Sequence, residues 1–392
     1  MISVQEAKAI ISANLIPLAP VVLSLEQANN HILAADVFAI CDIPAFAQSS
    51  MDGYALKFND RYQPLSITGE MAAGVSETFE IAMGEAARIF TGAPLPAGAD
   101  TVVMQEKVEV REGKLFIKDE KLQFGLNVRD QGAEIKEKAL AMEKGSYLSP
   151  AALGFLAQLG ITEVKVYPMP KVGIILTGKE LQKPGEKLQF GQVYESNSYA
   201  LTAALNNAGI NDIQVYTADD DLDVLKNILA DVLEEKDVVL LTGGVSVGNY
   251  DFVVEAARLC GVNQLFHKVR QKPGKPLYVG RREEKLIFGL PGNPSSVLSC
   301  FYNYVLPSLH QLSQRENTVT EIQATLNAPY RKPAGLTHFL KGHYQNGKVE
   351  PLNAQESFRL SSFALANCLI CLPEEMEDFK IGDTLTLLLL PR

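Results

Sequence analysis

The feature that most constrains the fold is the alternation of apolar strands with amphipathic helices between residues 167 and 312. The predicted strands are Val172–Leu176, Ile213–Tyr216, Val238–Leu241 and Leu286–Leu290. The predicted helices are Ser198–Ala208, Leu222–Leu233, Phe252–Leu259 and Ser295–Leu306. Strands that alternate with helices favour a mostly parallel sheet covered by helices on both faces. We therefore expect a multidomain α/β plus β protein whose central α/β domain spans 167–312.

Strand-rich segments lie on both sides of this domain. Residues 49–137 contain short alternating runs and a Glu112-Gly113 turn, which predicts a β-rich domain with hairpins. Residues 313–392 return to short strands around an Asn346-Gly347 turn and end on an apolar strand at 384–390. This pattern fits a small C-terminal β-barrel or sandwich, and we expect the barrel.

The remaining residues, 1–48 and 138–166, are predicted to form an N-terminal helical domain. Two capping-box spacings, Ser3 to Glu6 and Ser24 to Gln27, indicate helix starts. A further helix is predicted over 151–159, after Ser149-Pro150. If this helix packs on the N-terminal ones, the β-rich domain is an insertion between them.

Charge balance and apolar runs exclude two classes of partner. The 392 residues include 36 Lys or Arg and 46 Asp or Glu, and the resulting net charge of −10 argues against a nucleic-acid backbone as the main partner. Apolar runs such as Leu387–Leu390 fall far short of the ~20 residues that a membrane span needs. The N-terminal residues carry no basic start followed by an apolar block, so we expect a cytoplasmic protein.

The five cysteines are too few and too scattered to predict a disulfide framework. Cys368 and Cys371 form one C-x-x-C pair inside an apolar run, with no second pair and no histidine nearby. Ordinary strand residues are therefore favoured here over a zinc or redox site.

A glycine-rich or acidic loop follows each of the four predicted strands. These loops are 177–180, 219–221, 242–251 and 289–295. One such loop is common turn material, but the carboxyl ends of parallel strands meet at one edge, where open α/β sheets bind their ligands. Four loops at one edge therefore predict a binding site.

The residue types in these loops suggest anion and metal chemistry. Glycines 243, 244 and 248 allow backbone N–H groups to surround an anion. Pro291–Pro294 either forms part of the site or is a simple turn into a helix, with Asn293 as N-cap and Pro294 in the first turn. The loops also carry carboxylates of the kind that bind Mg²⁺: Glu180, Asp219, Asp220 and Asp251. One of Asp219–Asp221 is instead expected to cap the following helix.

A basic segment follows the third predicted helix. Between Gln264 and Arg282 there are six basic residues and no acidic ones, which predicts a small anionic ligand, unless this is a solvated charged face. Three lysines of this segment are candidates for binding phosphate or another oxyanion: Lys268, Lys272 and Lys275. Nearby prolines stiffen the loop, so the lysine side chains can be held toward such a ligand. Acids, lysines and glycine loops together predict phosphate-ester chemistry with Mg²⁺.

Five motifs, in this order along the chain, resemble those of the molybdopterin molybdenumtransferases, the MoeA and gephyrin E-domain family. The motifs are Ser50–Ala55, Thr91–Pro96, Thr242–Gly248, Lys272–Pro276 and Gly289–Pro294. The resemblance extends from the N-terminal helices to the last strand. It implies a four-part homodimer with a MogA-like molybdopterin-binding domain at its centre.

The resemblance also implies an activity. Such proteins take adenylylated molybdopterin and molybdate, cleave the adenylyl linkage with Mg²⁺, and release AMP and molybdenum cofactor. The resemblance places their cleft between the α/β domain of one subunit and the β-rich domain of the other. The upstream adenylyltransferase and downstream cofactor-handling proteins are candidate partners.

Residue chemistry and resemblance together give a set of predicted site residues. Those with predicted catalytic roles are Asp52, Glu180, Asp219, Asp251, Lys268 and Lys272. Of these, the predicted metal ligands are Glu180, Asp219 and Asp251. Those predicted to bind the pterin substrate are Thr91, Gly243, Gly244, Ser246, Gly248, Lys275, Pro291, Gly292, Asn293, Pro294 and Ser357. Asp52, Thr91 and Ser357 rest on the resemblance alone.

Three positions depart from the family pattern. Lys179 replaces an acid beside Glu180, and Glu134 replaces a shorter acid. Lys341 stands where arginine is frequent, and a lysine cannot bind an anion through the two parallel hydrogen bonds that arginine forms. Two other functions stay open: molybdopterin adenylylation, which would consume ATP, and a gephyrin-like binding scaffold.

Overall fold

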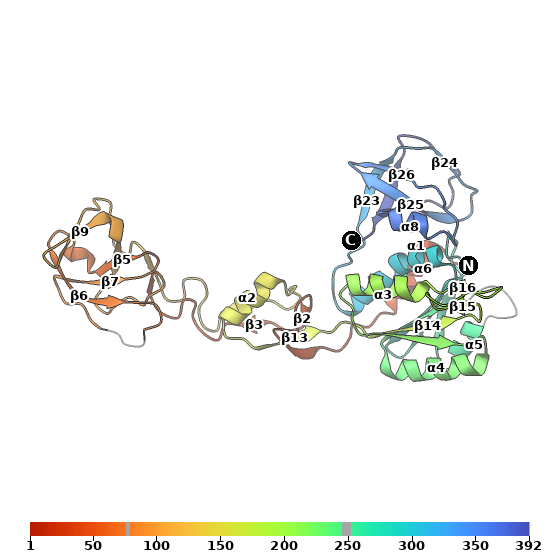
Figure 1. Ribbon diagram of the computed structural model, residues 1–392, viewed down its shortest axis with the longest axis horizontal. Helices are drawn as coiled ribbons and strands as arrows, with labels where there is room; N and C mark the ends of the chain where they lie inside the picture. The colour runs from red at the N-terminus through yellow and green to blue at the C-terminus, as the bar shows by residue number, and fades with distance from the viewer. Residues whose placement is uncertain (76–78, 245–251, 392) are drawn as a thin grey trace. The chain divides into compact units, whose positions relative to one another are not determined.

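The computed structural model describes residues 1–75, 79–244 and 252–391 (Figure 1). The chain forms two compact units, each described by itself. Unit 1 comprises Met1–Val21, Asn30–Ile32 and Tyr167–Arg392; unit 2 comprises Val22–Asn29 and Leu33–Val166. This division has fewer parts than the predicted four, and it places residues 1–21 and 138–166 of the predicted N-terminal domain in different units. The four-part division stays a prediction. In the described residues, no helix has the length and apolar character needed to cross a membrane.

Unit 1 contains the predicted α/β domain. Its six-stranded sheet has the order β17-β14-β18-β22-β21-β19. The first four strands are parallel, as predicted: β14 (Val172–Thr177), β17 (Ile213–Ala218), β18 (Val238–Thr242) and β22 (Lys285–Leu290). Two antiparallel strands that the sequence did not predict extend the edge: β19 (Asn263–His267) and β21 (Tyr278–Arg282).

Helices cover both faces of this sheet. Figure 1 shows α4 and α5 on one side of β14, with α3 and α6 on the other. The helices are α3 (Asn197–Asn207), α4 (Leu222–Glu235), α5 (Phe252–Leu259), α6 (Pro294–Cys300) and α7 (Leu306–Leu312). Alternate residues of β14 point to opposite cores: Ile175 packs with Leu229 of α4, whereas Ile174 belongs to the core that includes α3 and α6.

The predicted helix at Ser295–Leu306 is interrupted by a π-helical turn, Phe301–Val305, between α6 and α7. Pro307 follows the turn and has no N–H to donate to the preceding turn. The helix α1 (Val4–Ala13) begins with the predicted capping box, because Ser3 Oγ accepts from Glu6 N at 3.1 Å and Glu6 Oε2 accepts from Ser3 N at 2.6 Å.

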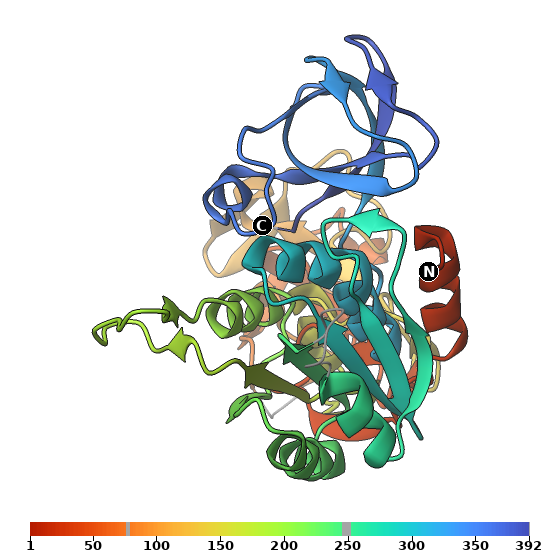
Figure 2. The same cartoon turned by 90° about the vertical axis from the view of Figure 1, so that its right-hand side faces the viewer.

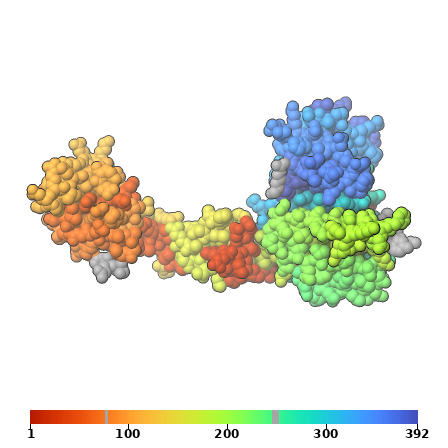
Figure 3. All heavy atoms as spheres, in the orientation of Figure 1, coloured from red at the N-terminus to blue at the C-terminus, as the bar shows by residue number. Residues whose placement is uncertain are grey.

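The C-terminal residues form a closed barrel, as predicted. Its strands are β23 (Glu321–Leu326), β25 (Thr337–Gln345), β26 (Lys348–Pro351), β27 (Cys368–Leu372) and β29 (Thr384–Leu389). Pairing of β25 with β27 closes it, and β20 (Gln271–Lys272) joins β25 at the edge. Figure 3 shows the barrel (blue) directly against the α/β domain (green). Cys368 and Cys371 lie in β27, as predicted.

Unit 2 contains the predicted β-rich domain as a six-stranded sheet, β8-β5-β7-β6-β10-β9. Its strands are β5 (Gly53–Leu56), β6 (Leu65–Met71), β7 (Glu85–Ile89), β8 (Thr101–Met104), β9 (Val108–Arg111) and β10 (Lys114–Ile117). The turn between β9 and β10 is Glu112-Gly113, where both residues have positive φ. The helix α2 (Pro150–Gln158) follows its N-cap Ser149, which also agrees with the sequence.

The helix start predicted at Ser24 is wrong. Val21–Ser24 forms the strand β1, which pairs with β13 (Glu163–Tyr167) and is followed by a turn. The β-branched residues Val21 and Val22 favour a strand, and this preference together with the pairing outweighs the capping-box spacing.

Candidate active site

A cavity of about 590 Å³ lies at the carboxyl edge of the α/β sheet. It is lined by the ends of β14, β18 and β22, and by an arm of β15 (Leu181–Gln182) and β16 (Val193–Tyr194). Figure 2 shows this arm (yellow-green) projecting from the domain. The cavity brings together seven of the predicted site residues: Glu180, Gly243, Gly244, Pro291, Gly292, Asn293 and Pro294.

The glycine loop after β18 requires glycine for two reasons. Gly243 and Gly244 have φ values of +89° and +64°, which side chains other than glycine rarely adopt. A Cβ on Gly243 would stand 2.7 Å from the carbonyl oxygen of Thr177. The loop is thus built for close backbone approach. The rest of the predicted loop lies outside the described residues, including Ser246, Gly248 and Asp251.

The Pro291–Pro294 loop starts α6 as predicted, but the Asn293 side chain has a different partner. Asn293 is the N-cap residue, and its carbonyl oxygen accepts from Val297 N at 3.0 Å. Its Nδ2 donates to Ser357 Oγ at 3.0 Å instead of its side chain capping the helix. The loop is also fixed from the other side, because Asn197 Nδ2 donates to Gly292 O at 2.9 Å.

Two buried polar atoms of the cavity lining have no hydrogen-bond partner among the described residues. They are Asn197 Oδ1 and Thr242 Oγ1. Buried polar groups are nearly always hydrogen-bonded, so such atoms leave capacity for a polar ligand or water. Thr242 begins one of the predicted loops but was not named as a site residue, and Asn197 was not predicted, because its role depends on where the strand and helix ends meet.

The predicted carboxylates are divided by the structure. Glu180 is the one acid among the described lining residues of the cavity, whereas Asp219 follows β17 and lines no part of it. Asp221 caps α4, accepting from Asp223 N and Val224 N at 3.0 Å each, as expected for one of the three aspartates. No group of three potential metal-ligand side chains occurs in the described ranges.

The donor set at Glu180 nevertheless fits Mg²⁺. This ion is usually bound through one or two carboxylates together with substrate phosphates and water, and does not need a cage of three protein ligands. A single carboxylate beside a glycine loop suited to an anion provides that combination.

The lysine segment lies at the same edge of the sheet. β19 is antiparallel to β21, which is antiparallel to β22, so β19 runs in the direction of β22 and ends at the carboxyl edge. Lys268 follows that end directly. Lys272 lines an adjacent cavity of about 510 Å³ together with Ser357 and His338. Lys268 and Lys275 line neither cavity.

Buried contacts fix the loop that carries Lys272 and Lys275. Gln271 is 1% exposed; its Nε2 donates to Gly274 O at 3.0 Å, and its Oε1 accepts from the hydroxyl of Tyr304. A Cβ on Gly274 would stand 2.5 Å from Cys300 Sγ, so the loop fits tightly against the π-helical turn and α6. The lysine ammonium groups are therefore carried on an ordered backbone.

His338 is a further residue that the sequence did not single out. Burial, and then the positive charges of Lys272 and Lys332, lower its pKa to about 4, so it is neutral at pH 7. Its backbone pairs with Lys272 across β20 and β25.

Asp52 and Thr91, which belong to unit 2, contact each other. Asp52 Oδ1 accepts from both Thr91 N and Thr91 Oγ1, each at 2.8 Å. The backbone hydrogen bond, followed by the hydroxyl bond, lowers the pKa of Asp52. The carboxylate is therefore ionised at neutral pH.

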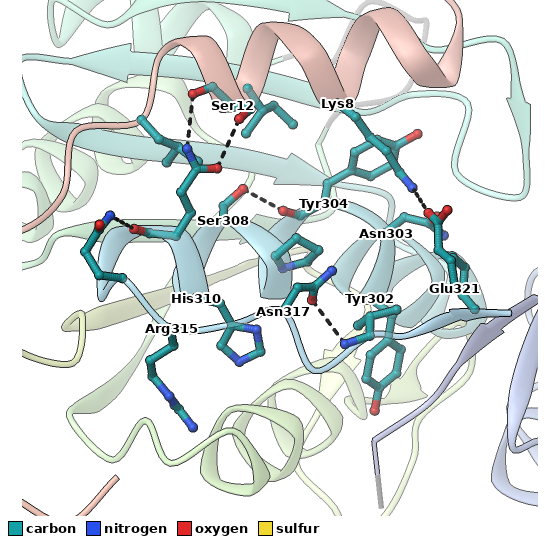
Figure 4. Close-up of a pocket in the computed structure, with 17 residues that line it drawn as sticks. Lys8, Ser12, Tyr302, Asn303, Tyr304, Ser308, His310, Arg315, Asn317 and Glu321 are labelled. Carbon is teal, nitrogen blue, oxygen red and sulfur yellow. Dashed lines mark hydrogen bonds and ion pairs between the residues drawn. The ribbon is translucent and has the colours of Figure 1, made fainter. Parts of the chain in front are cut away.

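A third cavity, of about 480 Å³, is lined by α1, the π-helical turn and α7 (Figure 4). Its walls pair with each other: Lys8 Nζ lies 3.1 Å from Glu321 Oε1, and Ser12 Oγ donates to Gln311 Oε1 at 3.1 Å. None of the predicted site residues lines it. It is therefore not the candidate active site.

Models of known families match three successive parts of the chain. They describe the MoeA N-terminal region (domain I and II) at 2–160, a probable molybdopterin binding domain at 173–311, and the MoeA C-terminal region (domain IV) at 323–390. The chain is 34% identical over 375 residues to the molybdopterin molybdenumtransferase of Haemophilus influenzae, covering 93% of this chain and 92% of that protein. The chain belongs to the MoeA family.

Two further comparisons agree. The molybdopterin molybdenumtransferase of Staphylococcus aureus is 33% identical over 387 residues, covering 94% of this chain and 91% of that protein. The crystal structure of a MoeA protein of molybdopterin biosynthesis from Pyrococcus horikosii superimposes with a TM-score of 0.85 and 30% identity, over 100% of this chain and 99% of that one. The resemblance and fold class predicted from the sequence are thus confirmed as those of MoeA.

Proposed function

We propose that this MoeA-family chain inserts molybdenum into adenylylated molybdopterin, with Mg²⁺-dependent cleavage of the adenylyl linkage and release of AMP. The observation that carries the proposal is the meeting of Glu180, the Gly243–Gly244 turn and the Pro291–Pro294 loop in one cavity at the carboxyl edge of the sheet. The relatives named above are molybdopterin molybdenumtransferases, and this chain matches them over nearly their whole length.

The charges around this cavity suit two anionic reactants. Molybdate and a pyrophosphate repel each other, by about 4 kcal/mol for two unit charges roughly 4 Å apart near a protein surface. We propose that the positive charge of Lys272, which lines the adjacent cavity on an ordered loop, offsets this repulsion. The glycine turn is proposed to approach a substrate phosphate through its backbone N–H groups.

Glu180 is proposed to hold Mg²⁺ in the cavity. Asp219, which follows β17 outside the cavity lining, and Asp251, which lies outside the described residues, are proposed as its further ligands. When bound, Mg²⁺ would neutralise phosphate oxygens and make the phosphoanhydride easier to cleave. Hydrolysis of that bond consumes one water molecule and releases AMP. Lys268, Lys275 and Ser357 are proposed to bind and orient the substrate's anionic groups.

We also propose that the chain acts as a homodimer in which Asp52 and Thr91 take part in the reaction. Mixing an inactive Asp52→Ala variant with an inactive Lys272→Ala variant tests this proposal. Recovery of up to about a quarter of wild-type activity would support residues shared between subunits; no recovery in mixed dimers confirmed by mass would contradict it.

The function itself is tested by incubating the chain with adenylylated molybdopterin and measuring AMP. Release of AMP that depends on both molybdate and Mg²⁺ is expected. Consumption of ATP with unmodified molybdopterin, and no AMP from the adenylylated form, would instead indicate an adenylyltransferase.

A further inference from the structure

A segment of the C-terminal barrel reaches the α/β domain. Residues 354–359 lie between β26 and α8 (Ser361–Leu365). Within the segment, Ser357 O accepts from Ser295 N at 3.1 Å, and Ser357 Oγ accepts from Asn293 Nδ2 at 3.0 Å. Ser357 lines the cavity that contains Lys272, and Phe358 lines both that cavity and the one that contains Glu180. The segment is therefore a shared wall of the two cavities.

A single buried ammonium group, carried by a strand of the barrel, holds this wall in place. Lys341 lies in β25 and is 2% exposed. Its Nζ donates to three carbonyl oxygens of the segment: Ala354 O at 2.8 Å, Arg359 O at 3.1 Å and Glu356 O at 3.3 Å. A lysine ammonium has three protons, so its donor capacity is fully used. The Nζ of Lys341 therefore has no proton left for an anion, and the expected loss of a bidentate anion contact at this position stays untested.

Neighbouring contacts give the same segment its shape. Gln355 Oε1 accepts from Lys341 N at 3.0 Å, and Gln355 Nε2 donates to Lys341 O at 2.8 Å. The hydroxyl of Ser362 donates to Ala354 O at 2.7 Å. Ala354 has a φ of +63°, a conformation that costs a residue with a Cβ about 1–2 kcal/mol and needs surrounding contacts to persist.

We propose that Lys341 is a positioning residue, which orders the segment 354–359 so that Ser357 and Phe358 form the wall of the substrate cavities. Without the ammonium, three carbonyl oxygens that converge on a buried point would each lose one donor and keep only the bonds from Ser362 Oγ and Arg359 N. The segment would then turn these carbonyls toward water. The kinetic part of this inference rests on the proposed function; the structural part does not.

The test compares hydrogen–deuterium exchange and kinetics in matched variants. Lys341→Met keeps the length and apolar stem of the side chain and removes the donors. The control is Lys332→Met, because Lys332 is also buried in the barrel (3% exposed), but donates to Pro333 O and Glu374 O. Ser362→Ala removes the hydroxyl that donates to Ala354 O and Arg359 O of the same segment, and it serves as the milder variant should Lys341→Met fail to fold.

In Lys341→Met, exchange in peptides covering 352–362 should rise about tenfold, with a smaller rise in Ser362→Ala and wild-type exchange there in Lys332→Met. The KM for adenylylated molybdopterin should rise about tenfold in Lys341→Met with kcat within about threefold of wild type. Lys341→Arg should restore part of both properties, because a guanidinium also donates to several carbonyls.

Unchanged exchange of 352–362 in Lys341→Met would overturn the proposal. So would faster exchange with an unchanged KM, since the order of the wall would then not matter to the substrate. If the segment loosens as expected but the wild-type chain itself releases no AMP, the proposed function fails and the structural role of Lys341 stands.

Discussion

Asn293 and Ser357 form a hydrogen bond that joins the α/β domain to the C-terminal barrel, with Asn293 Nδ2 donating to Ser357 Oγ at 3.0 Å. Asn293 lines the cavity that contains Glu180, and Ser357 lines the cavity that contains Lys272. The cavities that contain Glu180, the proposed metal ligand, and Lys272, the proposed anion-binding lysine, are therefore linked through this one contact between two domains.

Removing this contact should weaken substrate binding more than folding. Ser357→Ala is expected to cost about 1 kcal/mol of unfolding free energy and to raise the KM for adenylylated molybdopterin several-fold. A double-mutant cycle with Asn293→Ala, measured by urea unfolding, should give a coupling of about 1 kcal/mol. A coupling near zero would mean that the bond contributes nothing to the domain contact.

The glycine turn should tolerate no side chain. Gly243→Ala places a Cβ 2.7 Å from Thr177 O at a φ of +89°, so we expect loss of AMP release and a fall in stability. Gly113→Ala is the matched control, because Gly113 also has positive φ (+75°) but a Cβ there meets nothing within 4 Å. The control should lose only the ~1–2 kcal/mol of backbone strain. Equal losses in the two variants would refute the close-approach explanation.

Glu180→Gln should change the response to Mg²⁺. The amide keeps the size of the side chain and removes its charge, so the Mg²⁺ concentration for half-maximal AMP release should rise about tenfold or more. Glu186→Gln, on the same projecting arm but outside the cavity lining, is the control and should keep the wild-type Mg²⁺ response. A wild-type Mg²⁺ response in Glu180→Gln would remove Glu180 from the metal site.

Two buried histidines should make the fold sensitive to acid. Burial lowers the pKa of His310 and of His338 to about 4, from an unfolded value near 6.5. Between these values the unfolded chain binds protons that the folded chain does not, so the free energy of unfolding should fall as pH drops from 6.5 to 4, by roughly 1–3 kcal/mol per histidine. His310→Phe should reduce this slope in urea titrations; an unaltered slope would show that His310 does not contribute.

The central strands and their loops could be predicted because local patterns encode them. β14 and β18 are continuous apolar runs, and each is followed by glycine at the sheet edge. β19 was missed because Asn263 and Gln264 interrupt its apolar pattern at the exposed edge of the sheet, where polar residues are tolerated.

The site was predictable only in part. Glycine and proline motifs located the cavity, since backbone conformation is readable from residue type. The grip of Lys341 on residues 354–359 was not predictable, because a charged residue normally indicates a surface and only the folded barrel brings its ammonium to three carbonyls. Asp219 was placed in the site from its position after a strand, yet it lies outside the cavity lining.

The most direct measurement is a crystal structure of the chain with adenylylated molybdopterin, with Mg²⁺ omitted to prevent turnover. We expect the substrate phosphates to lie against Gly243 and Gly244, beside the wall formed by Phe358, with room for a metal ion between the phosphates and the Glu180 carboxylate. Phosphates bound instead in the cavity between α1 and α7, or away from the carboxyl edge of the sheet, would contradict it.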